Sequence, residues 1–174
     1  MRSMTNYLKT GDLLLLGLFN QSLHCRLLDG FMSAITLLGS VGFAITLPIL
    51  LMLSGQDSLA EAGYKMAWVL VLGESIVFLI KRLVHRPRPF NILAGIINRK
   101  PTKCPYSLPS GHTCAAFSQA LVLAAAFPGL SIVFLVLAVM VGISRVYLGV
   151  HYPTDVAVGG LTGHAAFWLV HLWI

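Results

Sequence analysis

The sequence predicts an all-α fold, a polytopic transmembrane helical bundle of about five spans with an N-terminal interfacial amphipathic helix. Two observations carry this prediction. In composition, 57% of the 174 residues are hydrophobic and only 10% are charged, whereas soluble domains are nearer a quarter charged. So little polar surface cannot cover a sphere of this size. In addition, the chain contains five apolar runs that each approach the length of about 20 residues needed to cross a bilayer.

The first element is a short apolar stretch, Leu13 to Phe19. It is too short to cross a membrane and has no small-residue cleavage site after it, so it indicates neither a span nor a cleaved signal peptide. We expect an amphipathic helix on the membrane surface within residues 1–30, because polar residues surround the stretch: Asp12, Asn20, Gln21, His24 and Arg26.

The apolar runs predict spans over residues 31–53, 64–84, 111–127, 130–148 and 155–174. Pro128 and Gly129 make a tight turn between the third and fourth spans. The one long loop, residues 85–110, carries five prolines, and a loop this long in so small a protein is usually functional. We therefore expect residues 1–174 to form one membrane-embedded domain, with residues 31–174 as the bundle.

Counting the spans brings distant parts of the chain to one side of the membrane, which we name side X. The second span ends at the long loop, the third span leaves from it, and the fourth span returns. Hence the long loop, the start of the third span and the break between the fourth and fifth spans are neighbours on side X. The N-terminal amphipathic helix falls on side X too, and the C-terminus on the other side.

The chain is basic, with a net charge of +6 and an isoelectric point of about 9.6. Such a charge suggests nucleic acid, anionic lipid or a phosphorylated substrate as partner. Most basic residues lie close to apolar spans, so we expect no nucleic-acid binding. The three cysteines, Cys25, Cys104 and Cys114, predict free thiols, although the last two could pair across the long loop. No Cys/His spacing is typical of a zinc site.

Three polar clusters meet on side X, at residues 81–90 (KRLVHRPRPF), 107–113 (SLPSGHT) and 144–155 (SRVYLGVHYPTD). Lys81, Arg88 and Arg145 supply fixed positive charge, and arginine can bind phosphate oxygens through two parallel hydrogen bonds. Ser110 and Gly111 precede the third span, where a helix N-terminus exposes backbone N–H groups to an anion. Together these residues predict a site for a tetrahedral oxyanion.

Two histidines beside such a site indicate covalent phosphoryl transfer. One neutral imidazole attacks phosphorus, and the other, protonated, gives its proton to the leaving oxygen. Asp155 follows His151 by four residues, so the two share a face if the chain is already helical there. A carboxylate in this place holds the tautomer of the attacking ring. The chain has no cluster of carboxylates for Mg²⁺, and the cations take the place of a metal, so we expect no cofactor.

These motifs resemble those of the type 2 phosphatidic acid phosphatase family, in the form of a small bacterial member. Lys81 followed by Arg88-Pro89 resembles the first motif, the sequence Pro109 to His112 resembles the second, and Ser144-Arg145 with His151 and Asp155 resembles the third. The resemblance covers the chain from the second span to the fifth. Many bacterial members have six spans, and here the first is reduced to the surface helix.

The resemblance implies an integral membrane lipid phosphatase that works through a phosphohistidine intermediate and without a metal. His151 would be the nucleophile, His112 the general acid and Asp155 the residue that orients the nucleophile. The implied phosphate-binding residues are Lys81, Arg88, Ser110, Gly111 and Arg145. The first candidate substrate is undecaprenyl diphosphate, and the alternatives are phosphatidylglycerophosphate, phosphatidic acid and the 1-phosphate of lipid A. A rival of another class is a lipid-phosphate transporter or binding protein; a haloperoxidase using vanadate is disfavoured because such relatives are soluble.

Two indications of which side of the membrane the site faces disagree. Apart from the motif residues, the other side of the membrane holds Lys65, whereas side X holds Arg2, Lys9, Arg26, Arg82, Arg86, Arg99, Lys100 and Lys103. The positive-inside rule would place side X in the cytoplasm, but the family resemblance implies a site facing the periplasm or exterior. We expect the latter, in a bacterial inner (plasma) membrane. The oligomeric state stays open.

Several residues keep two interpretations. Glu74, within the second span, either lines the substrate path or pairs with a buried cation, or else makes a structural hydrogen bond between helices. His85 and Arg86 contact either the phosphate or only the lipid headgroups. Headgroup contact is the preferred interpretation for Arg82, Arg99, Lys100 and Lys103. His164 and His171 are expected to be structural, and Gly159, Gly160 and Gly163 to let helices approach closely.

Overall fold

The computed structural model describes residues 4–173 apart from 24, 101 and 103, with side chains from Thr10 onwards. The described residues form helices and no strand, which confirms the predicted all-α bundle. In chain order the elements are α1 (Met4–Gly17), the π-helix η1 (Leu18–Ser22), α2 (Arg26–Ile35), the 3-10 helix η2 (Thr36–Gly39), α3 (Val41–Met52), α4 (Asp57–Val84), α5 (Pro89–Ile92), α6 (Gly111–Ala126), the 3-10 helix η3 (Pro128–Leu130), α7 (Ser131–Tyr147) and α8 (Pro153–His171).

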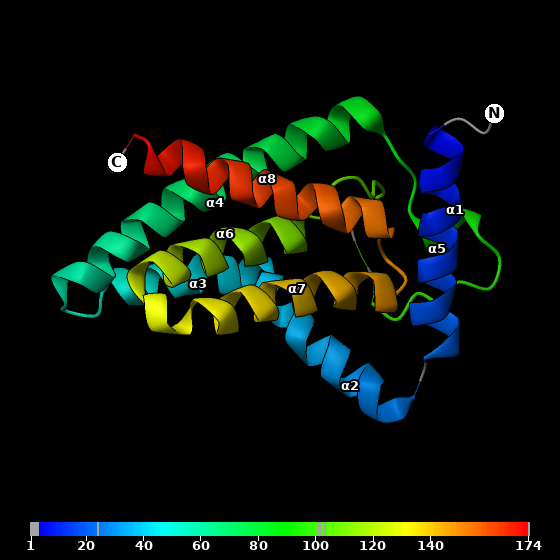
Figure 1. Cartoon of the computed structure of the whole chain (residues 1–174), viewed down its shortest axis with the longest axis horizontal. Helices are drawn as coiled ribbons and strands as arrows, with labels where there is room; N and C mark the ends of the chain where they lie inside the picture. The colour runs from blue at the N-terminus through cyan, green and yellow to red at the C-terminus, as the bar shows by residue number, and fades with distance from the viewer. Residues whose placement is uncertain (1–3, 24, 101, 103, 174) are drawn as a thin grey trace.

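Helix α6 is the centre of the bundle and packs against α4, α7 and α8 (Figure 1). Small residues allow the closest of these approaches. A Cβ atom added to Gly159 of α8 would lie 2.5 Å from the carbonyl oxygen of Ser110, and one on Gly163 would lie 2.6 Å from that of Cys114. The predicted role of these two glycines is therefore confirmed, while Gly160 faces the Phe117 ring at an ordinary distance of 3.4 Å.

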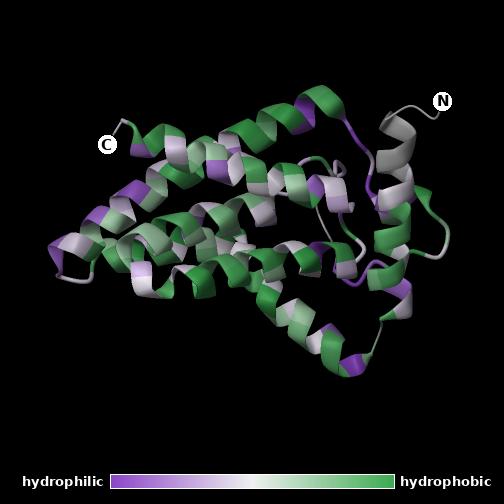
Figure 2. Ribbon diagram, in the orientation of Figure 1, coloured by the Kyte–Doolittle hydropathy of each residue, from purple (hydrophilic) through white to green (hydrophobic). Residues whose placement is uncertain are grey.

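Hydrophobic residues make up most of the length of the bundle helices, as Figure 2 shows, and many of them face outwards. Large hydrophobic side chains are exposed on α3, α4, α7 and α8, among them Val41, Val71, Phe78, Ile132 and Leu161. A soluble monomer rarely exposes so much contiguous apolar area, whereas a lipid-facing surface requires it. Among the described helices, Pro128–Tyr147 is by itself long and apolar enough to cross a membrane, and Gly111–Ala126 is a shorter apolar helix.

The first predicted span, residues 31–53, is not one straight helix. The segments Arg26–Gly39 and Val41–Met52 meet at an angle of 54°, and Ser40 begins the second segment by accepting a hydrogen bond from the Phe43 amide at 3.3 Å. Hydropathy does not reveal this break because apolar residues continue on both sides of it. The break brings η2 against α6 and α7, next to the polar clusters.

Helix α1 lies across the end of the bundle at which α4 and α7 end and α6 and α8 begin, and the C-terminus lies at the opposite end (Figure 1). This arrangement confirms the prediction that the N-terminal helix shares side X with the long loop. Leu13, Leu14 and Leu15 are exposed on it, while Asp12 and Leu16 are buried against the bundle. A helix with this orientation fits the predicted interfacial element.

The long loop is held in place at both ends and in its middle. Pro87 and Tyr106 form an isolated antiparallel bridge, and the Ser107 amide donates to the Arg86 carbonyl at 2.8 Å. Asn20 of η1 holds the middle of the loop, because its side chain accepts from the Ile97 amide at 2.9 Å and donates to the Ile97 carbonyl at 3.0 Å. The N-terminal segment therefore clamps the loop onto the bundle.

Candidate active site

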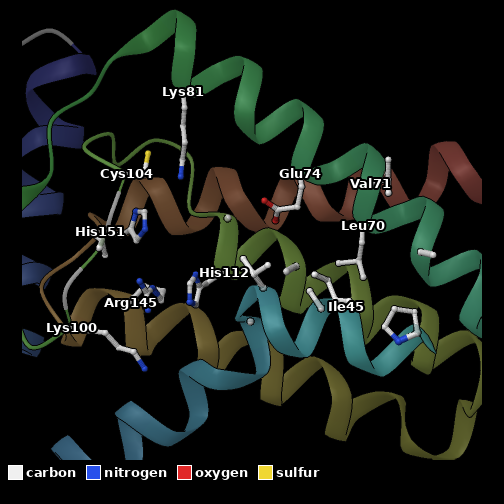
Figure 3. Close-up of a pocket in the computed structure, with 18 of the residues that line it drawn as sticks. Ile45, Leu70, Val71, Glu74, Lys81, Lys100, Cys104, His112, Arg145 and His151 are labelled. Atoms are coloured by element: carbon white, nitrogen blue, oxygen red, sulfur yellow. The ribbon is translucent and has the colours of Figure 1, made fainter. Parts of the chain in front are cut away.

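One cavity of about 790 Å³ gathers the side chains that the sequence motifs singled out. Its polar end is shown in Figure 3, where Lys81, His112, Arg145 and His151 approach one another from four different segments. The predicted residues that line this end are Lys81, Arg88, Gly111, His112, Arg145 and His151. The other two predicted residues, Ser110 and Asp155, lie behind the cavity wall.

His151 is held by the tight turn between α7 and α8. Gly149 has a φ of +75°, and a Cβ atom added to it would collide with the Ile97 carbonyl oxygen, which explains a glycine here. Arg88 fixes the other side of the turn: its Nη1 atom donates to the Val150 carbonyl at 2.9 Å, and its Nε atom donates to the Cys104 carbonyl at 2.7 Å. The backbone around His151 is thus set from two directions.

The two nitrogens of the His151 ring face different surroundings. Arg88 Nη1 lies 3.2 Å from Nε2, and because a guanidinium can only donate, Nε2 presents its lone pair. The ring proton is then on Nδ1, whose nearest carboxylate oxygen is Oδ2 of Asp155 at 3.5 Å. This separation is longer than a good hydrogen bond, as is common for catalytic groups before substrate binds.

The charge state of His151 follows from its burial. Loss of solvation lowers the pKa of His151 well below its usual range, and the positive charges of Arg145, Arg88 and Lys81 lower it further. The imidazole is therefore neutral at physiological pH. A neutral ring with its Nε2 lone pair directed to a cation-lined cavity is a competent nucleophile.

Asp155 is fully buried in the first turn of α8 and uses both of its oxygens. Oδ2 accepts from the Tyr152 amide at 2.9 Å, which caps the helix, and Oδ1 accepts from Arg86 Nη1 at 2.7 Å. The same Oδ2 atom faces His151. The helix cap and the arginine therefore fix the carboxylate at the Nδ1 edge of the imidazole.

Arg145 lies in the last turn of α7 and is only 2% exposed. Its Nη1 atom donates to Oγ1 of Thr36 at 2.8 Å, whereas its Nε atom has no hydrogen-bond partner within the described part of the chain. Thr36 belongs to η2, so the break in the first predicted span serves the site directly. A buried guanidinium with a free donor beside the cavity is suited to an anion.

The N-terminus of α6 is divided between structure and cavity. Ser110 is its N-cap: Oγ accepts from the Thr113 amide at 3.3 Å and from the Thr113 hydroxyl at 2.8 Å, and the Ser110 amide donates to the Asp155 carbonyl at 3.0 Å. These bonds hold Ser110 behind the cavity wall, and its role in phosphate binding stays a prediction. Gly111 and His112, the next two residues, do line the cavity.

The cavity continues from its polar end into an apolar groove between α3 and α4. Figure 3 places Ile45, Leu70 and Val71 along this part, with Glu74 where the polar and apolar parts meet. The groove is open to the outside, since Val41, Ile45 and Val71 are all more than half exposed. Of the two interpretations of Glu74, the geometry favours the one in which it lines the substrate path.

Sequence reasoning left other contributors open or assigned them differently. Arg86 is bound to Asp155 and does not line the cavity, and His85 packs edge-on against Tyr106. Lys100 was predicted to contact headgroups but lines the cavity. The role of Asp12 was missed, although an acid directly before the apolar stretch that begins at Leu13 is a signal that it needs a buried partner. Lys103 and Arg2 lie outside the described residues.

Residues expected to be structural lie away from the cavity. His164 accepts from the Trp168 indole at 2.9 Å and His171 stacks on Phe167, both in the last helix. Arg82 lies over the Phe78 ring at 4.6 Å, at the surface of α4. Cys104 and Cys114 carry free thiols, and only Cys104 lines the cavity.

Comparison with protein families gives a match to the PAP2 superfamily over residues 62–174. An undecaprenyl-diphosphatase of Sulfolobus acidocaldarius is 38% identical over 54% of this chain and 44% of that protein. Phosphatidylglycerophosphatase B of Bacillus subtilis is 33% identical over 82% of this chain and 73% of that protein. Against several curated relatives, the Sulfolobus protein among them, the chain spans about half of the relative's length.

A solved structure shares the arrangement of helices over most of this chain. Aquifex aeolicus LpxE superposes with a TM-score of 0.82 at 29% sequence identity, over 92% of this chain and 94% of that one. The similarity therefore reaches beyond the three motifs and includes the N-terminal part of the bundle.

Proposed function

Because the chain belongs to the PAP2 superfamily, we propose that it is an integral membrane lipid phosphatase acting through a phosphohistidine intermediate. The observation that carries the proposal is the arrangement around His151. Its neutral ring directs the Nε2 lone pair towards a cavity lined by Lys81, Arg88 and Arg145, and the Asp155 carboxylate stands at Nδ1.

In the first step Nε2 of His151 attacks the terminal phosphorus of the lipid. The bond from phosphorus to the lipid-side oxygen breaks, that oxygen takes the electron pair, and His112 supplies its proton. The imidazole becomes a positively charged phosphohistidine, and the Asp155 carboxylate stabilises this charge across Nδ1–H. In the second step water attacks phosphorus, His112 takes the proton from the water, and inorganic phosphate leaves as the His151 ring is restored.

The negative charge on the phosphoryl oxygens is balanced by fixed donors. Lys81, Arg88 and Arg145 supply three positive charges, and the α6 N-terminus at Gly111 supplies the positive end of a helix dipole. Ser110 contributes by capping that helix end. These groups are already in position before substrate binds, so little reorganisation opposes the reaction.

The substrate class is a lipid whose hydrocarbon tail lies in the groove between α3 and α4 while its phosphate reaches His151. Undecaprenyl diphosphate is the first candidate, because the groove is apolar and one relative is named for that activity. Phosphatidylglycerophosphate is supported by the relative that matches most of this chain. Phosphatidic acid and the 1-phosphate of lipid A complete the set.

We place the protein in a bacterial inner membrane with side X facing outwards. A cysteine introduced at the exposed Ala94 of the long loop, in a chain without its native cysteines, would report this orientation. An impermeant thiol reagent is expected to label it in intact cells. Labelling only after permeabilisation would put side X in the cytoplasm.

The activity is tested by phosphate release from each of the four lipids in detergent with EDTA present. We expect turnover of at least one lipid diphosphate or monophosphate, and its loss in folded His151→Ala protein. A lipid-phosphate transporter or binding protein would bind the same lipids and release no phosphate. Full turnover by His151→Ala would refute the proposed mechanism, and a comparison of kcat/KM across the lipids would identify the substrate.

A further inference from the structure

A chain of charged groups lies behind the nucleophile, and its far end belongs to the N-terminal helix. Arg86 Nη1 donates to Asp155 Oδ1 at 2.7 Å, and Arg86 Nη2 donates to Asp12 Oδ2 at 2.7 Å. The order is therefore Asp12, Arg86, Asp155, His151. Asp12 and Arg86 are 74 residues apart in the sequence, and neither aligns with a motif residue identified above.

Asp12 is anchored to the helix that carries Asp155. Its Oδ1 atom accepts from the Thr154 amide at 2.9 Å, and its Oδ2 atom accepts from the Thr154 hydroxyl at 2.6 Å. The side chain is only 4% exposed. A carboxylate this deeply buried is costly unless it is paired and hydrogen-bonded, so the contacts hold α1 firmly against the first turn of α8.

The Arg86 guanidinium is held in one plane by these partners. Its Nη1 atom also donates to the Thr154 hydroxyl at 2.7 Å, and its face lies 4.0 Å from the centre of the Tyr152 ring. A planar group fixed on both nitrogens and on one face has little rotational freedom. It therefore fixes Oδ1 of Asp155, and with it the direction in which Oδ2 faces His151.

We propose that Asp12 and Arg86 are positioning residues for phosphoryl transfer, and that α1 is thereby part of the catalytic apparatus in addition to an interfacial anchor. The inference rests on the proposed function, since it needs Asp155 to orient an attacking His151. Without Asp12, Arg86 loses one of its two carboxylate partners, and its hold on Oδ1 of Asp155 becomes less rigid. The step that suffers is the attack on phosphorus, and not the binding of the lipid.

The test uses the full-length protein in detergent and the lipid with the highest kcat/KM in the panel above. Asp12→Asn keeps the shape of the side chain and removes its charge, and we expect kcat to fall about 10- to 100-fold with KM within threefold. The kcat of Arg86→Gln is expected to fall by at least the same factor. Because both act through Asp155, the double variant should be no worse than Arg86→Gln alone. Asp57→Asn, an exposed acid at the start of α4, is the matched control.

Two other roles for Asp12 give different results. If α1 only anchored the protein or guided the lipid, Asp12→Asn would raise KM and leave kcat unchanged. If Asp12 only stabilised the fold, the melting temperature and the folded fraction would fall while kcat per folded molecule stayed constant. Either result would overturn the inference, as would strictly multiplicative effects in the double variant.

Failure of this inference is distinguishable from failure of the proposed function. An active wild type, an inactive His151→Ala and a fully active Asp12→Asn would reject the role of Asp12 alone. Equal phosphate release by the wild type and His151→Ala would reject the proposed function, and with it this inference.

Discussion

The two edges of the His151 ring are built in opposite ways. At the Nδ1 edge, Asp155 is buried and bound through Arg86 and the Tyr152 amide. At the Nε2 edge, several cationic side chains line the cavity, and Arg145 retains an Nε atom without a hydrogen-bond partner in the described part of the chain. The protein thus fixes the carboxylate at the Nδ1 edge, 3.5 Å from the ring, and leaves donors available at the Nε2 edge, where an anion is to bind.

Removing the charge at the Nδ1 edge of His151, which we name the closed edge, should have the largest effect. In Asp155→Asn the side chain keeps its size, but a neutral amide no longer stabilises the imidazolium that forms during attack, and its NH₂ group opposes the donors of Arg86. We expect kcat to fall about 10³- to 10⁴-fold, as for loss of the carboxylate in a serine triad. Steady-state phosphate release measures this fall.

Circular dichroism and the elution volume in detergent would show that Asp155→Asn protein is folded. If folded Asp155→Asn protein retained more than a tenth of the wild-type kcat, the proposed difference between the two edges of His151 would be wrong.

Changing the Nε2 edge of His151, which we name the open edge, should have a smaller effect, because several cationic side chains bind the phosphate together. Arg145→Lys keeps the positive charge but loses the planar pair of donors and the hydrogen bond to Thr36. We expect kcat/KM to fall about 10- to 100-fold, measured with the best lipid substrate.

Thr36→Ser is the matched control for this prediction, because it retains the hydroxyl that accepts from Arg145 and removes only a methyl group. It should stay within a few-fold of wild type. An unchanged kcat/KM in Arg145→Lys would mean that the guanidinium geometry is unimportant at the open edge.

The open edge was predictable from the sequence, and most of the closed edge was not. Counting apolar spans and reading the motif spacing brought Lys81, His112 and His151 to one side of the membrane, because helices fix which of their ends are neighbours. The His151–Asp155 pair was predicted on the condition that the chain is helical between the two residues, and this condition is not met. Helix α8 begins after Tyr152, its extended N-cap, so the bond from the Tyr152 amide to Asp155 Oδ2, and not a shared helical face, directs the carboxylate towards His151.

The contacts that the sequence did not predict depend on how segments distant in the chain pack against one another. Thr36 meets Arg145 across 109 residues only because the first predicted span breaks at Ser40, and Asp12 meets Arg86 only because α1 turns across the end of the bundle. Neither event leaves a hydropathy signal. Lys100 was predicted to contact lipid headgroups for a similar reason, because a loop sequence does not indicate the direction in which the loop folds.

The smallest effect concerns pH and tests both edges together. Burial, with the charges of Arg145, Arg88 and Lys81, lowers the pKa of His151. The ring should therefore stay neutral, with its proton on Nδ1, from pH 8 down to pH 5. Nitrogen NMR of imidazole-labelled protein in detergent would show this, with His151→Gln used to assign the signal.

The same depressed pKa predicts how stability depends on pH. The unfolded chain takes up a proton at this histidine near pH 6.5, whereas the folded protein does not. The contribution of His151 to stability is thus fully present above about pH 6.5 and decreases as the pH falls below it, by at most about 1.4 kcal/mol per pH unit. His151→Gln should lose this part of the acid sensitivity of the melting temperature. A wild-type His151 signal that titrates near pH 6.5 would show that the open edge does not keep the nucleophile neutral.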